Sequence, residues 1–386
     1  KSAGIVYGTY GKGRFVWMGF ELNSILGNQD DYIYFDRFFQ NSIHWLTYTP
    51  IAYVRDWPKG YNAAAIITPV LSNEEKNIQN LFKILSEENI KATFFVESKK
   101  VNQFPDLIRS LPNYGEIAAI VDIGYLSAAN DTLNKLDDAE TQTKKFISAK
   151  NNLEAATQTK IFGALPYYGL YNQNTFKGLI NAGYQYVFTD SLTDRSVPKT
   201  IIRGDNRIFA MTKTARDDYE VIRDFHLNDV DFQRYTYQED IDRILFEGGM
   251  YVYKIHTDYQ CRPENISVVK DIIENLKSKK FWITTANEVQ KWYAKRSFIE
   301  LRVDRRGNRR VAFTISNPGK KNVDQLVIEV DMNVDAKNIS LSSEMIRTKM
   351  VKYKFNNFNR ILYVYVDELG ANESRTYYID YDRPNA

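Results

Sequence analysis

The chain has little of the residues that most often carry metal and redox chemistry. Its 386 residues include one cysteine, Cys261, and three histidines. A single cysteine excludes an internal disulfide and any zinc site built from four thiolates. It says little about the cell compartment, because a protein can be exported without disulfides.

Long apolar runs and blocks of one charge are also missing. No run of 18 apolar residues occurs, so we expect no transmembrane segment. Lysine and arginine number 51 against 48 aspartates and glutamates, and both signs are mixed along the chain. This argues against nucleic acid as a partner. The first residue, Lys1, is not methionine and the chain opens in strand-like sequence, so we expect a mature or truncated chain.

The first fifty residues predict a hairpin and a helix. Residues 4–20 alternate around the glycine-rich turn Gly11-Lys-Gly13, which is typical of a β-hairpin. Phe35, Phe38, Phe39 and Leu46 then recur at helical spacing and predict an amphipathic helix over about 31–47 that docks on the hairpin. Fifty residues are too few for a complete domain.

Two further patterns follow. Residues 51–60, with Pro58 and Gly60, predict a linker, and strand and helix signals then alternate to about residue 297, which favours a parallel sheet or barrel. From Phe298 onward apolar residues recur with period two, which predicts an all-β, Ig-like sandwich. We therefore expect three parts: 1–50, 51–297 and 298–386. The strands expected in the middle part cover residues 63–68, 92–97, 116–121, 160–164, 184–188, 207–211, 250–255 and 281–284.

The middle part resembles the polysaccharide deacetylases of the NodB-homology type, carbohydrate esterase family four. The similarity rests on these segments: Asn62-Ala-Ala-Ala-Ile-Ile-Thr68, Asn89-Ile-Lys-Ala-Thr-Phe-Phe-Val96, Leu165-Pro-Tyr-Tyr-Gly169, Ala182-Gly-Tyr184 and Tyr253-Lys-Ile-His256. The resemblance implies an α/β fold, a distorted (β/α) barrel with its site at the C-terminal strand ends.

The N-terminal stretch has a second, shorter resemblance. The run from Gly8 to Phe20, followed by a helix ending in His44-Trp45-Leu46, resembles the C-terminal end of a glutamine-amidotransferase-like, flavodoxin-like domain. Such amidotransferases need a nucleophilic cysteine, and Cys261 lies more than 200 residues away in another part. We therefore expect no amidotransferase activity.

The deacetylase resemblance also shows what is missing. Its members use an aspartate base, an aspartate metal ligand and two histidine ligands. The matching positions hold Pro69, Val70, Ile120 and Gly124. None of these residues has a side-chain lone pair that could accept a proton or coordinate a cation. The arginine of another family motif corresponds to Ala164. We therefore expect no metal such as zinc, and no other cofactor.

Other parts of the family's site remain. His256 matches the family's catalytic acid, and Pro166 and Tyr167 survive from the motif that lost its arginine. We predict a groove lined by Tyr125, Tyr167, Tyr168 and His256, because aromatic rings suit the faces of sugar rings. A structural remnant at a strand end is the alternative interpretation for His256.

A relocated cation site is a further alternative. Asp122, Asp190, Asp258 and either Asp217 or Asp218 come near predicted strand ends, and with His256 they offer oxygen ligands. Loop capping is the ordinary role of such aspartates, and their spacing is irregular.

The sequence thus predicts a catalytically inactive deacetylase-like protein that binds or helps to process a cell-wall or extracellular polysaccharide. An active carbohydrate N- or O-deacetylase with a relocated site, and a scaffold for protein contacts, are the alternatives. The expected partners are an amino-sugar glycan or another polysaccharide, and proteins of its assembly or export. The resemblance implies a periplasmic, outer-surface or secreted bacterial protein.

Overall fold

The computed structural model describes residues 4–20, 29–72, 74–124, 136–189, 196–343 and 351–382. The chain divides into two compact units. One unit joins Lys1–Gly60 with Ala294–Ala386, and the other is Tyr61–Tyr293. The N-terminal sixty residues therefore fold with the C-terminal part of the chain.

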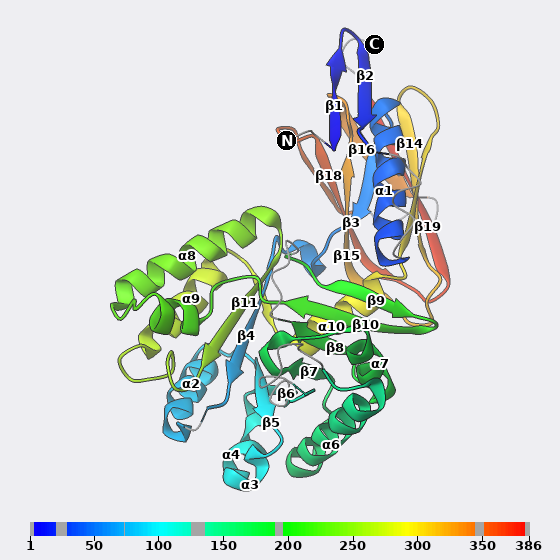
Figure 1. Cartoon of the computed structure of the whole chain (residues 1–386). Coiled ribbons are helices and arrows are strands. Elements are labelled where there is room, and N and C mark those ends of the chain that lie inside the picture. The colour runs from blue at the N-terminus through cyan, green and yellow to red at the C-terminus, as the bar shows by residue number, and fades with distance from the viewer. Residues whose placement is uncertain are drawn as a thin grey trace. The chain divides into compact units, whose positions relative to one another are not determined.

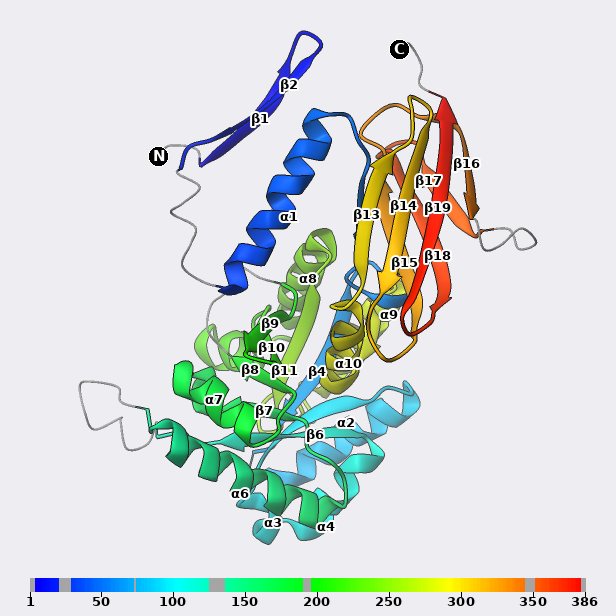
Figure 2. The ribbon, with the colours of Figure 1, turned by 90° about the vertical axis from the view of Figure 1, so that its right-hand side faces the viewer.

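Two four-stranded antiparallel sheets form most of the first unit (Figures 1 and 2). The order of the first sheet is β13 (Glu300–Arg305), β14 (Arg310–Asn317), β19 (Glu373–Asp382) and β16 (Lys337–Ser343). The order of the second is β17 (Tyr353–Asn356), β18 (Ile361–Leu369), β15 (Val323–Asp331) and β3 (Ile51–Val54). The period-two pattern thus correctly predicted an all-β sandwich.

The edge strand β3 differs from the linker that residues 51–60 predict. Glu329 of β15 pairs with Tyr53, and Val330 pairs with Ala52, so β3 completes the second sheet. Four residues between prolines carry too short a pattern to predict a strand, and the partner strand lies more than 270 residues away in the chain. Pairing with β15 gives the backbone of β3 the hydrogen bonds that local sequence could not indicate.

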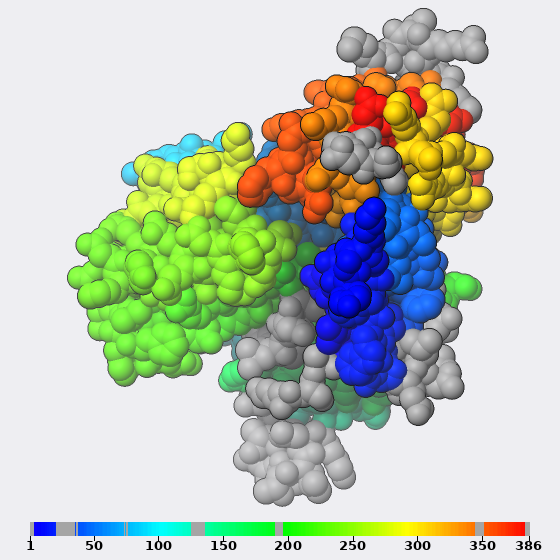
Figure 3. Space-filling view, turned by 90° about the horizontal axis from the view of Figure 1, so that it is seen from above, coloured from blue at the N-terminus to red at the C-terminus, as the bar shows by residue number. Residues whose placement is uncertain are grey.

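The predicted hairpin and helix are present. β1 (Ile5–Tyr10) pairs with β2 (Gly13–Met18), and α1 (Gln29–Leu46) follows. Tyr7 of the hairpin meets Trp45 of α1 edge to face, with ring centroids 5.6 Å apart, and the guanidinium of Arg14 lies 4.7 Å from the Trp45 ring. The helix therefore docks on the hairpin as expected, and the hairpin, in dark blue, lies at the molecular surface in Figure 3.

The second unit is built on one curled nine-stranded sheet (Figure 1). Its order is β11 (Met250–His256), β4 (Ala64–Val70), β5 (Ala92–Glu97), β6 (Gly115–Val121), β7 (Gly163–Pro166), β8 (Tyr186–Thr189), β10 (Asn206–Thr212) and β9 (Lys199–Arg203), with β12 (Trp282–Thr284) also paired to β4. All neighbours are parallel except β9, which forms a hairpin with β10 that the sequence did not predict. A curled, largely parallel sheet is the barrel-type α/β fold that the sequence predicts.

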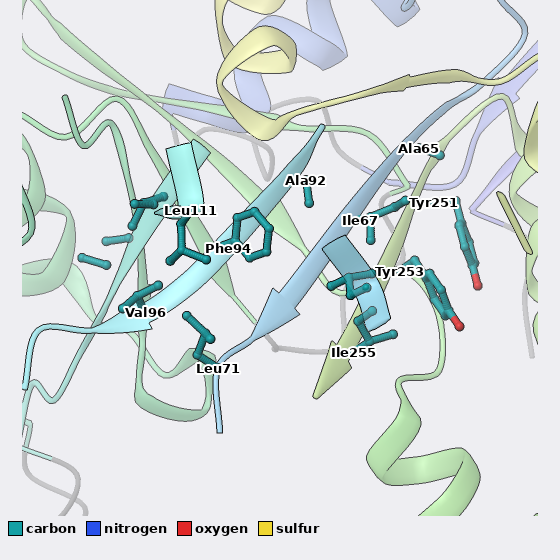
Figure 4. Packing of buried hydrophobic residues seen from close by; sticks show 14 of the residues in the cluster. Ala65, Ile67, Leu71, Ala92, Phe94, Val96, Leu111, Tyr251, Tyr253 and Ile255 are labelled. Carbon is teal, nitrogen blue, oxygen red and sulfur yellow. The ribbon is translucent and has the colours of Figure 1, made fainter. Parts of the chain in front are cut away.

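Helices cover the outer face of this sheet. They are α2 (Glu75–Glu87), α3 (Lys100–Gln103), α4 (Pro105–Ser110), α6 (Ala139–Thr157), α7 (Gln173–Asn181), α8 (Val230–Glu247) and α9 (Ile266–Ser278). The last helix, α10 (Ala286–Arg296), instead contacts residues of the opposite face, since the N–H of Ala286 bonds to Thr93 Oγ1 and the Tyr293 ring meets that of Phe209. Alternate strand residues such as Ile67, Phe94 and Tyr253 point to the helices of the outer face and are buried with them (Figure 4). The intervening residues, Lys254 and His256 among them, therefore face the interior of the curl.

Candidate functional site

The candidate site lies where the parallel strands end. His256 is the last residue of β11 and pairs with Val70, the last residue of β4. Ile255 pairs with Pro69, and Val70 also pairs with Phe95 of β5. Residues at the carboxyl edge of adjacent parallel strands share one end of the sheet, so the base and ligand positions of the family motif lie beside His256.

His256 is held by a buried carboxylate. Its ring atom Nδ1 lies 2.6 Å from Oδ1 of Asp218, and Asp218 has no exposed surface. Oδ2 of Asp218 accepts the backbone N–H of His256 at 2.6 Å and that of Gln260 at 3.2 Å. Burial raises the pKa of Asp218, against the lowering effect of these bonds from His256. The carboxylate thus fixes both the ring and the backbone at the end of β11.

One face of the His256 ring is covered. The ring of Tyr219 stacks on it with centroids 3.5 Å apart and planes at 10°, and His256 is only 5% exposed. With Nδ1 donating to Asp218, Nε2 is the nitrogen that remains to accept or donate a proton. Sequence reasoning named Asp218 only as an alternative metal ligand, although its place a few residues after a buried strand marked it as a residue of this edge.

The positions of the family's metal ligands do not fit a divalent cation. Val70 and Ile120 offer only hydrocarbon, and Gly124 has no side chain, so none supplies the nitrogen or oxygen donors that zinc or a similar ion requires. Across the described ranges, no group of three or more histidine, cysteine, aspartate or glutamate side chains is placed to hold a metal ion.

Gly124 is also fixed by its backbone. Its φ of 106° is one that residues with a Cβ rarely adopt, and a Cβ added there would lie 2.9 Å from atoms of Asp137. The N–H of Gly124 is bonded to Asp122 Oδ1 at 3.0 Å. A histidine at this position would therefore need the loop to rebuild, so the loss of this ligand extends to the backbone.

Two predicted groove residues lie at the end of β7. Pro166 ends the strand and pairs with Val121 of β6. Tyr167 follows it, and burial, together with the negative charge of Glu97 at the end of β5, raises the pKa of the phenol. Tyr167 and His256 thus share one edge of the sheet, on β7 and β11, with three strands between them.

Tyr168 is the most exposed of the predicted groove residues. It is 66% exposed, and its φ of 54° lies in the left-handed region that β-carbons disfavour. Its ring meets that of Tyr167 edge to face at 6.4 Å. A strained, exposed aromatic side chain at a strand end is consistent with a binding role. Tyr125, the remaining predicted groove residue, lies outside the described residues.

The aspartates of the alternative cation site have separate partners. Asp122 caps the Gly124 turn, and Asp217 pairs with Lys213 at 3.0 Å. Asp258 has a buried Oδ1 without a hydrogen bond to any described residue, and Asp190 falls outside those residues. Asp122 and Asp217 therefore serve a loop and an ion pair, Asp218 serves His256, and the described aspartates form no group placed to hold a metal ion.

A buried lysine at the same edge was not expected. Lys100 is 4% exposed, and its ammonium donates to the backbone oxygen of Ser72, just beyond β4, at 3.0 Å. Burial lowers its pKa. Lysines adjacent in sequence, as 99 and 100 are, usually indicate a solvated surface, so no local pattern could reveal that this one turns inward.

Comparison with known proteins finds similarity to one family and to several solved structures of the same fold. Residues 68–187 match the family model of polysaccharide deacetylase. Among solved structures, a Mycobacterium smegmatis protein assigned to the polysaccharide deacetylases is 19% identical, with a TM-score of 0.54 over 65% of this chain and 97% of that one. A Pseudomonas aeruginosa PAO1 protein with the same assignment is 14% identical, with a TM-score of 0.52 over 62% and 94%.

The allantoinase Puue is also similar, at 16% identity and a TM-score of 0.52 over 62% of this chain and 92% of that one. No curated protein matches the chain by sequence. At such identities the structures show the fold alone, and the family match covers residues 68–187: this stretch is similar to the polysaccharide deacetylases. The matched residues lie within Tyr61–Tyr293, so the amidotransferase-like resemblance of residues 1–50 stays a prediction. No helix in the described ranges is long and apolar enough to span a membrane.

Proposed function

We propose that this chain binds a polysaccharide at the carboxyl edge of its barrel sheet and does not deacetylate it. The observation that carries the proposal is the replacement of the base and all three metal ligands by Pro69, Val70, Ile120 and Gly124, while His256 keeps its buried partner. Hydrolysis of an amide needs an activated water and stabilisation of the oxyanion. Without a base or a metal at the positions of Pro69, Val70, Ile120 and Gly124, His256 alone neither activates the water nor stabilises the oxyanion.

The binding half of the proposal rests on Tyr167 and Tyr168. An exposed aromatic ring at a strand end offers a flat apolar face with a polar tip, which suits the alternating apolar faces and hydroxyl rims of pyranoses. The Tyr167 ring is half-buried and meets the Tyr168 ring edge to face, so part of its freedom is already lost before ligand arrives, which lowers the entropy cost of binding. By family, the ligand is a cell-wall or extracellular amino-sugar polymer, and the protein acts in the periplasm, at the outer surface or outside the cell.

The catalytic half is tested by metal content and turnover. The purified full chain is analysed for bound divalent metal and assayed on acetylated chito-oligosaccharide, beside a His256→Ala variant. We expect substoichiometric metal and equal, background release of acetate from both proteins. Stoichiometric metal with turnover that depends on His256 would instead establish an active deacetylase with a relocated site.

The binding half is tested by calorimetric titration with acetylated and deacetylated chito-oligosaccharides. Tyr168→Ala should weaken binding about tenfold, the usual effect of removing an aromatic anchor. Tyr235→Ala is the matched control, since Tyr235 on α8 is exposed to nearly the same degree, 63% against 66%. A chain that binds no glycan on an array, or whose binding survives the loss of both Tyr167 and Tyr168, would favour the scaffold interpretation.

A further inference from the structure

The second sheet of the sandwich has an outward face with an unusual composition. Leu326, Ile328 and Val330 of β15 pair with buried residues of β18 and face the core. Alternation places the intervening residues on the opposite, outward face. From β17 to β3 and its continuation, that face carries Lys352, Lys354, Tyr363, Tyr365, Val327, Glu329, Asp331, Tyr53 and Arg55. Val327 and Glu329 are buried, with Gly60 beside Val327 and Tyr365, so the open part of the face consists of Lys352, Lys354 and Tyr53 and the half-buried Tyr363. Figure 3 shows residues of β17 and β18, in orange, at the molecular surface.

Four of these side chains form one row across the sheet. Lys354 pairs with Tyr363, Tyr363 with Glu329, and Glu329 with Tyr53, so all four strands contribute one residue at the same level. Directly opposed residues on neighbouring strands have Cβ atoms about 5 Å apart. The row therefore places two aromatic rings, a carboxylate and an ammonium in a line about 15 Å long, three strand spacings of about 4.8 Å each.

Glu329 holds the row in place. It is only 7% exposed, its Oε2 accepts the hydroxyl of Tyr53, and its Oε1 lies 3.2 Å from Nε of Arg55. The Arg55 guanidinium in turn lies 5.5 Å from the Tyr363 ring centre. Burial and the bond to Glu329 raise the pKa of Tyr53. Both oxygens of the carboxylate are thus engaged within the protein, and the two tyrosines are fixed around it.

The β17 side of the face carries two positive charges, Lys352 and Lys354. Lys352 and Lys354 are exposed, and neither forms an ion pair with a carboxylate in the described part of the chain. The ammonium of Lys352 lies 5.6 Å from the Tyr365 ring centre. Glu329 is engaged by Tyr53 and Arg55, and Asp331 accepts the N–H of Asn333. A ligand on this face therefore meets flat rings at the centre and two cations at one side.

We propose that this face binds an acidic polysaccharide, with sugar rings on Tyr53 and Tyr363 and uronate carboxylates at Lys352 and Lys354. Flat rings with hydroxyl tips match pyranose faces, and exposed ammoniums match carboxylates. An acidic peptide fits less well, because peptides recognised by sheets add to an exposed strand edge, whereas this row crosses a sheet face. The site lies in the sandwich unit alone and does not depend on the proposed function of the barrel.

The test is titration of the full chain with galacturonate oligomers in low salt. Lys354→Glu should weaken binding at least tenfold, and Tyr363→Leu, which keeps an apolar side chain but removes the flat ring, at least fivefold. Lys337→Glu is the matched control, since Lys337 is an exposed lysine on β16 of the opposite sheet; it should change binding less than twofold. Neutral galactose oligomers should bind at least tenfold more weakly than galacturonate.

Four outcomes would overturn the proposal. The first is that the wild-type chain does not bind galacturonate, and the second is that Lys354→Glu and Lys337→Glu lose equal affinity for it. The third is that Tyr363→Leu, with unchanged thermal unfolding, has no effect on binding. The fourth is that polyglutamate binds as tightly as galacturonate and that its binding depends on Lys354. Tyr168→Ala at the barrel edge should leave galacturonate binding unchanged. The two proposed sites can therefore fail separately.

Discussion

The buried carboxyl of Glu116 on β6 predicts a specific loss of stability as the pH rises. Its Oε1 accepts three hydrogen bonds: from Thr93 Oγ1 of β5 at 2.8 Å, Tyr186 OH of β8 at 3.1 Å and the N–H of Asn287 in α10 at 2.8 Å. Burial outweighs these bonds and raises the pKa of Glu116 from 4.5 to about 7. Because all three donors reach Oε1, the proton has its place on Oε2.

The sign of the effect follows from linkage. The folded-state pKa lies above the unfolded value, so the stabilisation by the neutral carboxyl is fully present below pH 4.5 and is lost as the pH rises through about 7. A pKa that differs by about one between the folded and unfolded states changes the free energy of unfolding by about 1.4 kcal/mol, and the cost accumulated between pH 5 and pH 8 is about 2.5 kcal/mol. The Glu116 residue is partly exposed, so we expect about 2 kcal/mol.

The perturbation is Glu116→Gln, which keeps an acceptor for the three donors and cannot ionise. Urea unfolding at pH 5 and pH 8, followed by hydrogen exchange of the β6 and α10 peptides, gives the free energy of unfolding of this unit. From pH 5 to pH 8, the free energy of unfolding of the Gln variant should rise by about 2 kcal/mol relative to that of the wild type. Glu264→Gln, at an exposed position, should track the wild type. Parallel pH profiles for the Glu116 variant and the wild type would refute the reasoning.

Three further predictions concern the same unit. Asp218→Ala should cost about 3–5 kcal/mol in urea unfolding, because a buried carboxylate and its three bonds are removed, and Asp218→Asn clearly less; equal losses would contradict the hydrogen-bonding account. Gly124→Ala should cost about 2–3 kcal/mol, from its positive φ and the 2.9 Å approach, whereas Gly204→Ala, with positive φ and open space, should cost about 1 kcal/mol. Cys261 is buried and its thiol pKa is raised, so iodoacetamide should label it only after unfolding, as mass spectrometry would detect; rapid labelling of the native chain would contradict its burial.

Much of the fold could be predicted because its signals are local. Alternating strand and helix patterns predicted a barrel-type sheet, and the strand expected at 92–97 is β5, Ala92–Glu97. The alternation of apolar and polar residues from Phe298 onward predicted the sandwich. The hairpin of β9 and β10 was missed because a five-residue strand with the pattern of Lys199–Arg203 has no clear alternation. The helix α6 begins at Ala139, where Asp138 caps it, and this start also has a local signal because aspartate is a favoured N-cap residue.

The sequence by itself determined which chemical groups exist at the candidate site. Val70, Ile120 and Gly124 cannot ligate a metal wherever they lie, because a side chain's donors are set by its identity. Only the tertiary structure decided which groups meet: Asp218 with His256, β3 with β15, and the row from Lys354 to Tyr53. The reason is physical. Side-chain identity and periodicity are properties of neighbouring residues, whereas strand pairing and burial depend on contacts between segments far apart in the chain, which form only when the whole unit folds.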